Sequence, residues 1–185
     1  MPKKTRLLAL IASVAAVNVA FRFALAWEPF NVKPIAFLTI VAAAVGGPLA
    51  GLAVGWLSMS ISDIVGFGAG IWTFETSSFM AIVGLIGGVL WQKSTSFNRW
   101  EMVAGGFLLT MVFDIGTSIL DAFLFNYPWI PAVLALYVPF LAGSPSPYPF
   151  GLAHELTTAI LLSSIGPSVI LRIRRIYQQG TPQAG

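Results

Sequence analysis

Residues 35–67 read IAFLTIVAAAVGGPLAGLAVGWLSMSISDIVGF, an apolar run with one interruption at Gly46-Gly47-Pro48. As a single helix, these 33 residues would extend about 50 Å at 1.5 Å per residue, whereas the hydrocarbon core of a bilayer is about 30 Å thick. Glycine next to proline is a strong signal for a break in the chain. We therefore expect two membrane-spanning helices, over residues 35–45 and 48–66, that turn back at this break.

The composition supports a membrane protein. Of the 185 residues, 57% are hydrophobic and 9% are charged, and Cys is absent. A soluble domain carries about 25% charged residues, so this chain has too few to cover a surface in water. The basic residues gather near the chain ends and in one loop, which argues against a nucleic-acid partner. The composition predicts an all-α, polytopic protein embedded in a lipid bilayer.

Four further apolar stretches complete the expected bundle, over residues 7–26, 76–91, 102–125 and 150–171. The first is longer than the apolar region of a signal peptide, so we expect it to be retained as a span. Residues 126–149 are rich in proline and hold one apolar piece, 133–141, that is too short to cross a membrane. The sequence predicts one domain, residues 1–185, with six spans and a long outer loop at 126–149.

The basic residues predict the orientation of these spans. Lysine and arginine near span ends favour the cytoplasm. Both chain ends are basic, so we expect both termini to be cytoplasmic and the number of spans to be even. Six spans place eight of the ten Lys and Arg residues on the cytoplasmic side, whereas five would leave the C-terminal arginines outside.

Ionisable residues inside membrane spans are costly and point to functional sites. Seven of them fall in the outer half of the expected bundle, and we add Trp72 and Asn126 from the outer loops. The predicted substrate-binding residues are Arg22, Asp63, Trp72, Glu75, Asp114, Asp121, Asn126, His154 and Glu155. Their clustering predicts a solute pocket open to the outside.

Structural roles compete with this interpretation. Arg22 would equally reach the lipid headgroups, and Asp63 or Glu75 would equally cap a helix. His154 and Glu155 would equally form a satisfied pair with Arg22. An acid/base pair of aspartates inside the membrane is a further alternative.

Small residues recur every four positions on three of the expected helices. Such rows allow helices to approach closely in lipid. The glycines at 47, 51 and 55 and those at 84 and 88 are expected to pack inside the bundle. The alanine row of the first span is a candidate face for docking another membrane protein, at Ala12, Ala16 and Ala20.

The sequence carries no motif for catalysis or metal binding. It has no phosphate-binding G-x-x-x-x-G-K-[ST] run and no G-x-S-x-G elbow. The run His154-Glu155-Leu156 begins like a zinc-peptidase helix, but the chain has only one His. We expect a protein that is not an enzyme and holds neither a metal nor a covalent cofactor.

Residues 46–55 (GGPLAGLAVG), 62–66 (SDIVG) and 84–88 (GLIGG), with the alanine row, resemble the substrate-binding S component of energy-coupling factor (ECF) vitamin transporters. The resemblance implies a six-span subunit in the plasma membrane of a prokaryote, which binds a vitamin at its outer side. It also implies that a membrane T component and two ABC ATPases supply the energy, and that Ala12, Ala16 and Ala20 contact the T component. The alternative is a membrane assembly or scaffold protein without transport activity.

The resemblance leaves the solute open. The excess of carboxylates over basic groups in the outer half predicts a neutral or cationic solute, and the aromatic residues predict a planar or bulky one. Riboflavin, thiamine or a cobalamin-type corrinoid fit these criteria, whereas the anionic vitamins biotin and folate fit less well.

Overall fold

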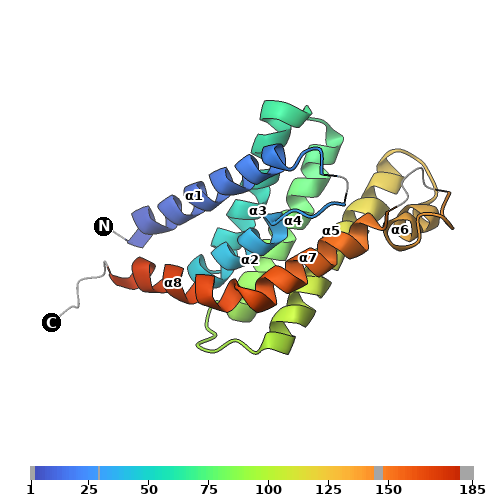
Figure 1. Cartoon of the computed structure of the whole chain (residues 1–185). Helices are drawn as coiled ribbons and strands as arrows, with labels where there is room; N and C mark the ends of the chain where they lie inside the picture. The colour runs from blue at the N-terminus through green and yellow to red at the C-terminus, as the bar shows by residue number, and fades with distance from the viewer. Residues whose placement is uncertain (1–2, 29, 144–147, 180–185) are drawn as a thin grey trace.

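The computed structural model describes residues 3–28, 30–143 and 148–179, and every regular element in them is a helix. In chain order (Figure 1) they are α1 (Lys3–Ala24), α2 (Ile35–Gly46), α3 (Pro48–Ser62), the π-helical turn η1 (Asp63–Phe67), α4 (Ile71–Trp91), α5 (Arg99–Leu124), α6 (Trp129–Tyr137), α7 (Phe150–Ser164) and α8 (Gly166–Gln179). The predicted all-α class is confirmed.

Within the described residues, four helices are long and apolar enough to cross a membrane: α1, α3 continued by η1, α4 and α5. A fifth candidate is the pair α7 and α8, bent by 58°. Helix α2 has 12 residues and extends only about 18 Å. Length and composition therefore give four or five candidate spans where the sequence predicts six, and they are compatible with a membrane location.

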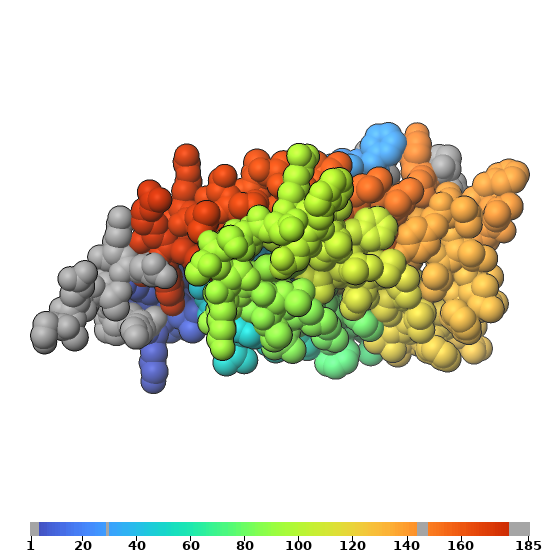
Figure 2. All heavy atoms as spheres, turned by 90° about the horizontal axis from the view of Figure 1, so that it is seen from below, coloured from blue at the N-terminus to red at the C-terminus, as the bar shows by residue number. Residues whose placement is uncertain are grey.

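The chain runs back and forth between two ends of an elongated bundle. The start of α1 and the end of α8 share one end, which we call the terminal end (Figure 1), where Arg6 Nη1 donates a hydrogen bond to the carbonyl of Tyr177 at 3.1 Å. The opposite end holds α6, and we call it the α6 end. Figure 2 shows α6 (orange) and α8 (red) at opposite ends of the molecule.

Helix α2 forms the centre of the bundle. Its residues are buried on all sides except for Leu38 and Gly46, and it packs against α1, α3, α4, α7 and α8. A helix that is apolar all round belongs in an interior. Because protein rather than lipid surrounds α2, its length is not set by the thickness of a bilayer.

Helices α3 and α4 touch backbone to backbone through glycines. A Cβ atom added at Gly51 would lie 2.3 Å from the carbonyl oxygen of Gly84, and one at Gly84 would lie 2.2 Å from that of Gly51. Gly55 and Gly88 lie equally close to the backbones of Met80 and Pro48. The prediction that these glycines pack inside the bundle is confirmed.

Arg174 joins α8 to the ends of α2 and α4 at the terminal end. Its guanidinium donates to the carbonyls of Ala44 at 2.7 Å, Trp91 at 2.5 Å and Gln92 at 3.0 Å, and also to that of Ser94. The last carbonyls of a helix carry partial negative charge and lack partners within the helix. One cation therefore satisfies the ends of two helices.

The helices differ from two of the predicted spans, and a short helix lies in the predicted outer loop. Helix α4 begins at Ile71 rather than at residue 76, because Gly70 N donates to the Thr73 hydroxyl at 3.1 Å and caps the helix. The apolar piece at 133–141 lies partly in α6, whose 9 residues are too few to cross a membrane. The last span is not continuous, since Pro167 lacks the N–H that would extend α7 through Gly166.

Large apolar side chains cover the outside of the bundle. Leu8, Leu49, Val89 and Phe123 are each exposed by two thirds or more, at 66%, 74%, 70% and 70%. Other large apolar side chains are also more than half exposed, among them Ile64, Phe74, Trp100 and Ile160. In lipid the same side chains meet acyl chains, which agrees with the apolar helices.

Candidate solute-binding site

A cavity of about 210 Å³ lies toward the α6 end, between α1, the α1–α2 loop and helices α2 to α5 and α7. Its polar lining consists of Arg22, Asn31, Lys33, Thr76 and His154. Its apolar lining consists of Ile35, Met59, Met80 and Phe113. An apolar chamber with a few convergent polar groups is the usual form of a small-molecule site.

The α1 and α3 side of the cavity is fixed by an ion pair. Arg22 Nη1 lies 2.8 Å from Asp63 Oδ1 and also donates to the Met59 carbonyl at 3.1 Å and to the Ser62 hydroxyl. Asp63 is 2% exposed and does not line the cavity. The carboxylate therefore holds Arg22 from behind, and the arginine forms the wall.

The α5 and α7 side has the same arrangement. His154 Nδ1 lies 3.0 and 3.2 Å from the two carboxylate oxygens of Asp114, and both residues are buried. His154 lines the cavity and Asp114 does not. Because the carboxylate occupies Nδ1, Nε2 is the ring nitrogen that has no hydrogen bond among the described residues. The ring of Phe113 packs edge-on against this imidazole, with centroids 5.9 Å apart.

The α1–α2 loop supplies the third basic group. Asn31 adopts a left-handed conformation, φ 58°, which brings the loop back toward the bundle just before Lys33. Burial and the nearby Arg22 lower the pKa of Lys33, while Glu28 acts in the opposite direction. The two carboxylate oxygens of Glu28 accept the backbone N–H groups of Phe30 and Val32, each at 2.6 Å. Lys33 forms no ion pair within the described part of the chain.

The α6 region covers this end through two tyrosines. The Tyr137 hydroxyl donates to Glu155 Oε1 at 2.5 Å, and the Tyr127 hydroxyl donates to Asp121 Oδ2 at 2.7 Å. Burial, with the hydrogen bond to Asp121, raises the pKa of Tyr127 to about 12, and burial with the bond to Glu155 raises that of Tyr137. These bonds tie α6 and the loop before it to α5 and α7.

Two of the predicted substrate-binding residues, Arg22 and His154, line the cavity. Asp63 and Asp114 orient these two, and Glu75 and Glu155 are buried without lining it. The remaining three, Asp121, Trp72 and Asn126, lie away from the cavity lining.

Local structure accounts for Trp72 and Asn126. Trp72 is 41% exposed, and its indole N–H donates to the Gly68 carbonyl at 3.2 Å. Asn126 has a φ of 55° at the end of α5, where Tyr127 N donates to the Ala122 carbonyl at 3.0 Å. This is a left-handed helix end.

The predicted pairing of His154 with Arg22 is wrong, since each has its own aspartate.

A buried polar cluster on α1, α2 and α3 was missed by the sequence analysis. The side-chain amide of Asn18 donates to Thr39 Oγ1 at 3.2 Å and Ser58 Oγ at 3.1 Å, and Asn18 is fully buried. Uncharged side chains in an apolar span give only a weak sequence signal. The cluster fixes the face that α1 turns toward the bundle, so the alanine row at Ala12, Ala16 and Ala20 is left exposed.

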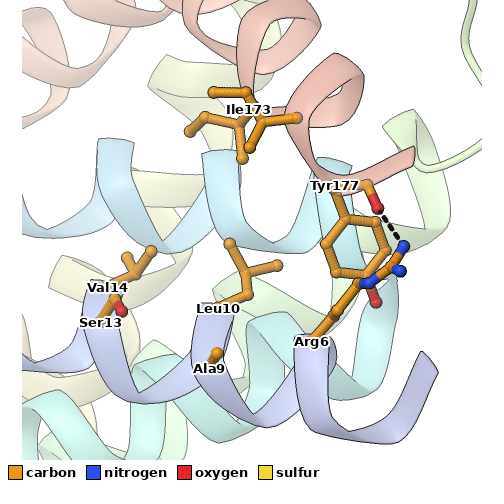
Figure 3. Close-up of a pocket in the computed structure, with 8 residues that line it drawn as sticks. Arg6, Ala9, Leu10, Ser13, Val14, Ile173 and Tyr177 are labelled. Carbon is orange, nitrogen blue, oxygen red and sulfur yellow. Dashed lines mark hydrogen bonds between the residues drawn. The ribbon is translucent and has the colours of Figure 1, made fainter. Parts of the chain in front are cut away.

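A second, larger cavity of about 480 Å³ is an open groove between α1 and α8 at the terminal end. Figure 3 shows Leu10 of α1 and Ile173 of α8 on its two sides, with Arg6 bonded to the Tyr177 carbonyl at one end. Its lining is mostly apolar and contains none of the predicted substrate-binding residues. It therefore lacks the convergent polar groups that distinguish the first cavity.

Among the described residues, no three His, Cys, Asp or Glu side chains are placed to hold a metal ion. Comparisons with protein-family models, with curated proteins and with solved structures find no match to this chain.

Proposed function

We propose that this protein is the membrane-embedded, substrate-binding S component of an ECF-type importer, which captures a small solute for ATP-driven uptake. The observation that carries the proposal is the cavity toward the α6 end. There, polar groups from α1, α4, α7 and the α1–α2 loop converge on one chamber between apolar walls. A binding subunit needs such a chamber, whereas a scaffold protein does not.

The proposed topology has six crossings in the plasma membrane of a prokaryote. The start of α1 and the end of α8 lie at the same end of the bundle, which supports an even number of passes. Helix α2 is then a short inner pass and the bent pair α7–α8 is the sixth. Lys93 and Arg99 lie beyond α4 and at the start of α5, at the end that Arg174 ties together, and these basic residues support assigning this end to the cytoplasm.

The proposed partners are a membrane T component and two ABC ATPases, which would supply the energy because the sequence holds no nucleotide motif. The exposed alanine row of α1 supports a docking face, because small side chains let a partner helix approach closely. The same exposed row supports the alternative, an assembly or scaffold protein. The two functions differ in whether the cavity binds a solute.

A plugged cavity tests the proposal. Thr76 lines the cavity from α4, so Thr76→Trp would fill it. Phe74, on the same helix, is 61% exposed, so Phe74→Trp adds the same ring outside the cavity. The parent protein and Phe74→Trp are expected to retain a co-purified small molecule in native mass spectrometry, whereas Thr76→Trp is expected to lose it.

Transport separates binding from docking. Ala16→Trp is expected to keep solute binding and to abolish uptake in cells that contain the partner subunits. If a solute is absent from all variants and uptake never depends on this chain, the scaffold function stands instead. If Thr76→Trp keeps its solute, the cavity is not the binding site.

A further inference from the structure

We propose that the cavity recognises a small solute through a carboxylate, which binds between the Lys33 ammonium and the Arg22 guanidinium. This inference rests on the proposed function and specifies its class of solute. It reverses the neutral or cationic solute expected from the sequence. That expectation counted the carboxylates at the expected depth of the pocket. A solute meets only the side chains that line the cavity, and the carboxylates bonded to basic residues are not among them.

The two aspartates lie farther from the cavity than the basic side chains to which they are bonded. Asp63 and Asp114 are bonded to Arg22 and His154, and only the basic member of each pair lines the cavity. No carboxylate is part of the lining formed by the described residues. A solute that enters the cavity therefore meets Arg22 and His154 rather than the carboxylates bonded to them.

Lys33 forms no ion pair within the described part of the chain, and the one carboxylate whose charge acts on it is that of Glu28. Asp63 and Asp114 already have basic partners, and both oxygens of Glu28 are engaged by backbone N–H groups. Burial and the repulsion of Arg22 lower the pKa of Lys33, so the unliganded cavity holds two cations that disfavour each other. A single negative charge between them relieves this repulsion, which matches a carboxylate better than a doubly charged phosphate.

The size and walls of the cavity define the rest of the solute. Its volume of about 210 Å³ is below the roughly 300–1,000 Å³ of sites for drug-sized ligands. Met59, Met80 and Phe113 supply apolar lining beside the polar groups, which suits a compact apolar or aromatic body. A corrinoid does not fit such a volume. The expected solute is a small organic acid with a flat or aliphatic body.

Matched acid and amide probes test the charge. Purified protein would be titrated by calorimetry with nicotinate and biotin, with nicotinamide and biotinamide as neutral counterparts, and with riboflavin and cationic thiamine. We expect saturable binding of a carboxylate and at least about tenfold weaker binding of its amide, since a hydrogen bond to a charged group is lost. Lys33→Gln is expected to reduce carboxylate affinity about tenfold or more, and Lys33→Arg to preserve most of it.

Lys93→Gln is the matched control, because Lys93 is an exposed lysine beyond α4 at the terminal end. It is expected to leave the affinity unchanged. Tighter binding of an amide, riboflavin or thiamine would overturn the carboxylate inference and leave the proposed function intact. Carboxylate binding that Lys33→Gln does not weaken would also overturn it. Saturable binding of none of the six probes would count against the proposed function itself.

Discussion

The contact between α3 and α4 makes a quantitative prediction for Gly84→Ala. The added Cβ would lie 2.2 Å from the carbonyl oxygen of Gly51, whereas even a close carbon–oxygen contact is about 3.3 Å. Backbone atoms cannot move aside by changing rotamer, so the helices must separate by about 1 Å at a cost near the upper end of overpacking, about 3 kcal/mol. Alanine recovers about 1 kcal/mol of helix propensity, which leaves a net loss of about 2 kcal/mol.

Gly87→Ala is the control on the same helix. Its Cβ would meet Ile40 at 3.4 Å, which is ordinary van der Waals contact, so only the gain in helix propensity remains. For a chain of this length, 1 kcal/mol corresponds to roughly 2–4 °C in Tm. Thermal unfolding in detergent should therefore show Gly84→Ala about 4–8 °C below the parent and Gly87→Ala at or above it. Equal Tm values for the two variants would refute the close crossing.

Three further predictions concern charged and titrating groups. Arg174→Met should lower the free energy of unfolding by about 3 kcal/mol, because carbonyls of two helix ends lose a cation, and the stability of Arg174→Lys should lie between that of Arg174→Met and that of the parent. A lysine variant as stable as the parent would contradict the role of the forked guanidinium, which donates to several carbonyls at once. The control is Arg175→Met, at an exposed arginine. Asp121→Asn should move the pKa of Tyr127 from about 12 toward its ordinary value of about 10, measured by tyrosinate absorbance with Tyr127→Phe as the blank. The stability that Tyr127 contributes is present below pH 10 and is lost as the pH rises toward 12. An unchanged titration in Asp121→Asn would exclude the hydrogen bond between Tyr127 and Asp121. Without ligand, Lys33→Gln should be as stable as the parent or slightly more stable at neutral pH, because the lowered pKa of Lys33 means that folding disfavours the charged lysine. Chemical denaturation of the two proteins measures this difference. A clear loss of stability in the variant would show that a partner holds the lysine.

Two breaks at glycine and proline show why one helix break was predicted and the other was missed. Gly47 and Pro48 sit between two long apolar runs, and the length of the combined run forced the break. Gly166 and Pro167 carry the same signal, but residues 150–171 have the length of one span, so nothing in the hydropathy required a break there. The bend at that point comes from the missing N–H of proline, which hydropathy does not measure.

The sequence predicted two of the residues that line the candidate site, but it did not predict which charged side chains face the cavity. Arg22 and His154 were found because ionisable groups inside apolar spans are conspicuous. Lys33, Asn31 and Thr76 were missed because a loop lysine, a loop amide and a threonine in a helix are ordinary there. The sequence also gives no means of seeing that Asp63 faces away from the chamber, since side-chain pairing across helices depends on their rotation.

The unequal packing of the helices sets which part of the protein is stiff. Helices α3 and α4 meet through backbone atoms at Gly51 and Gly84, so neither can slide or tilt without breaking that seam. Helix α1 is only 11% buried along its apolar window and is separated from α8 by the open groove. Because α1 and the loop after it carry Arg22 and Lys33, the charged wall of the chamber belongs to the least buried of the long helices and its loop. The proposed carboxylate would therefore add ionic contacts on the side of the bundle where a long helix is least buried by the rest of the protein.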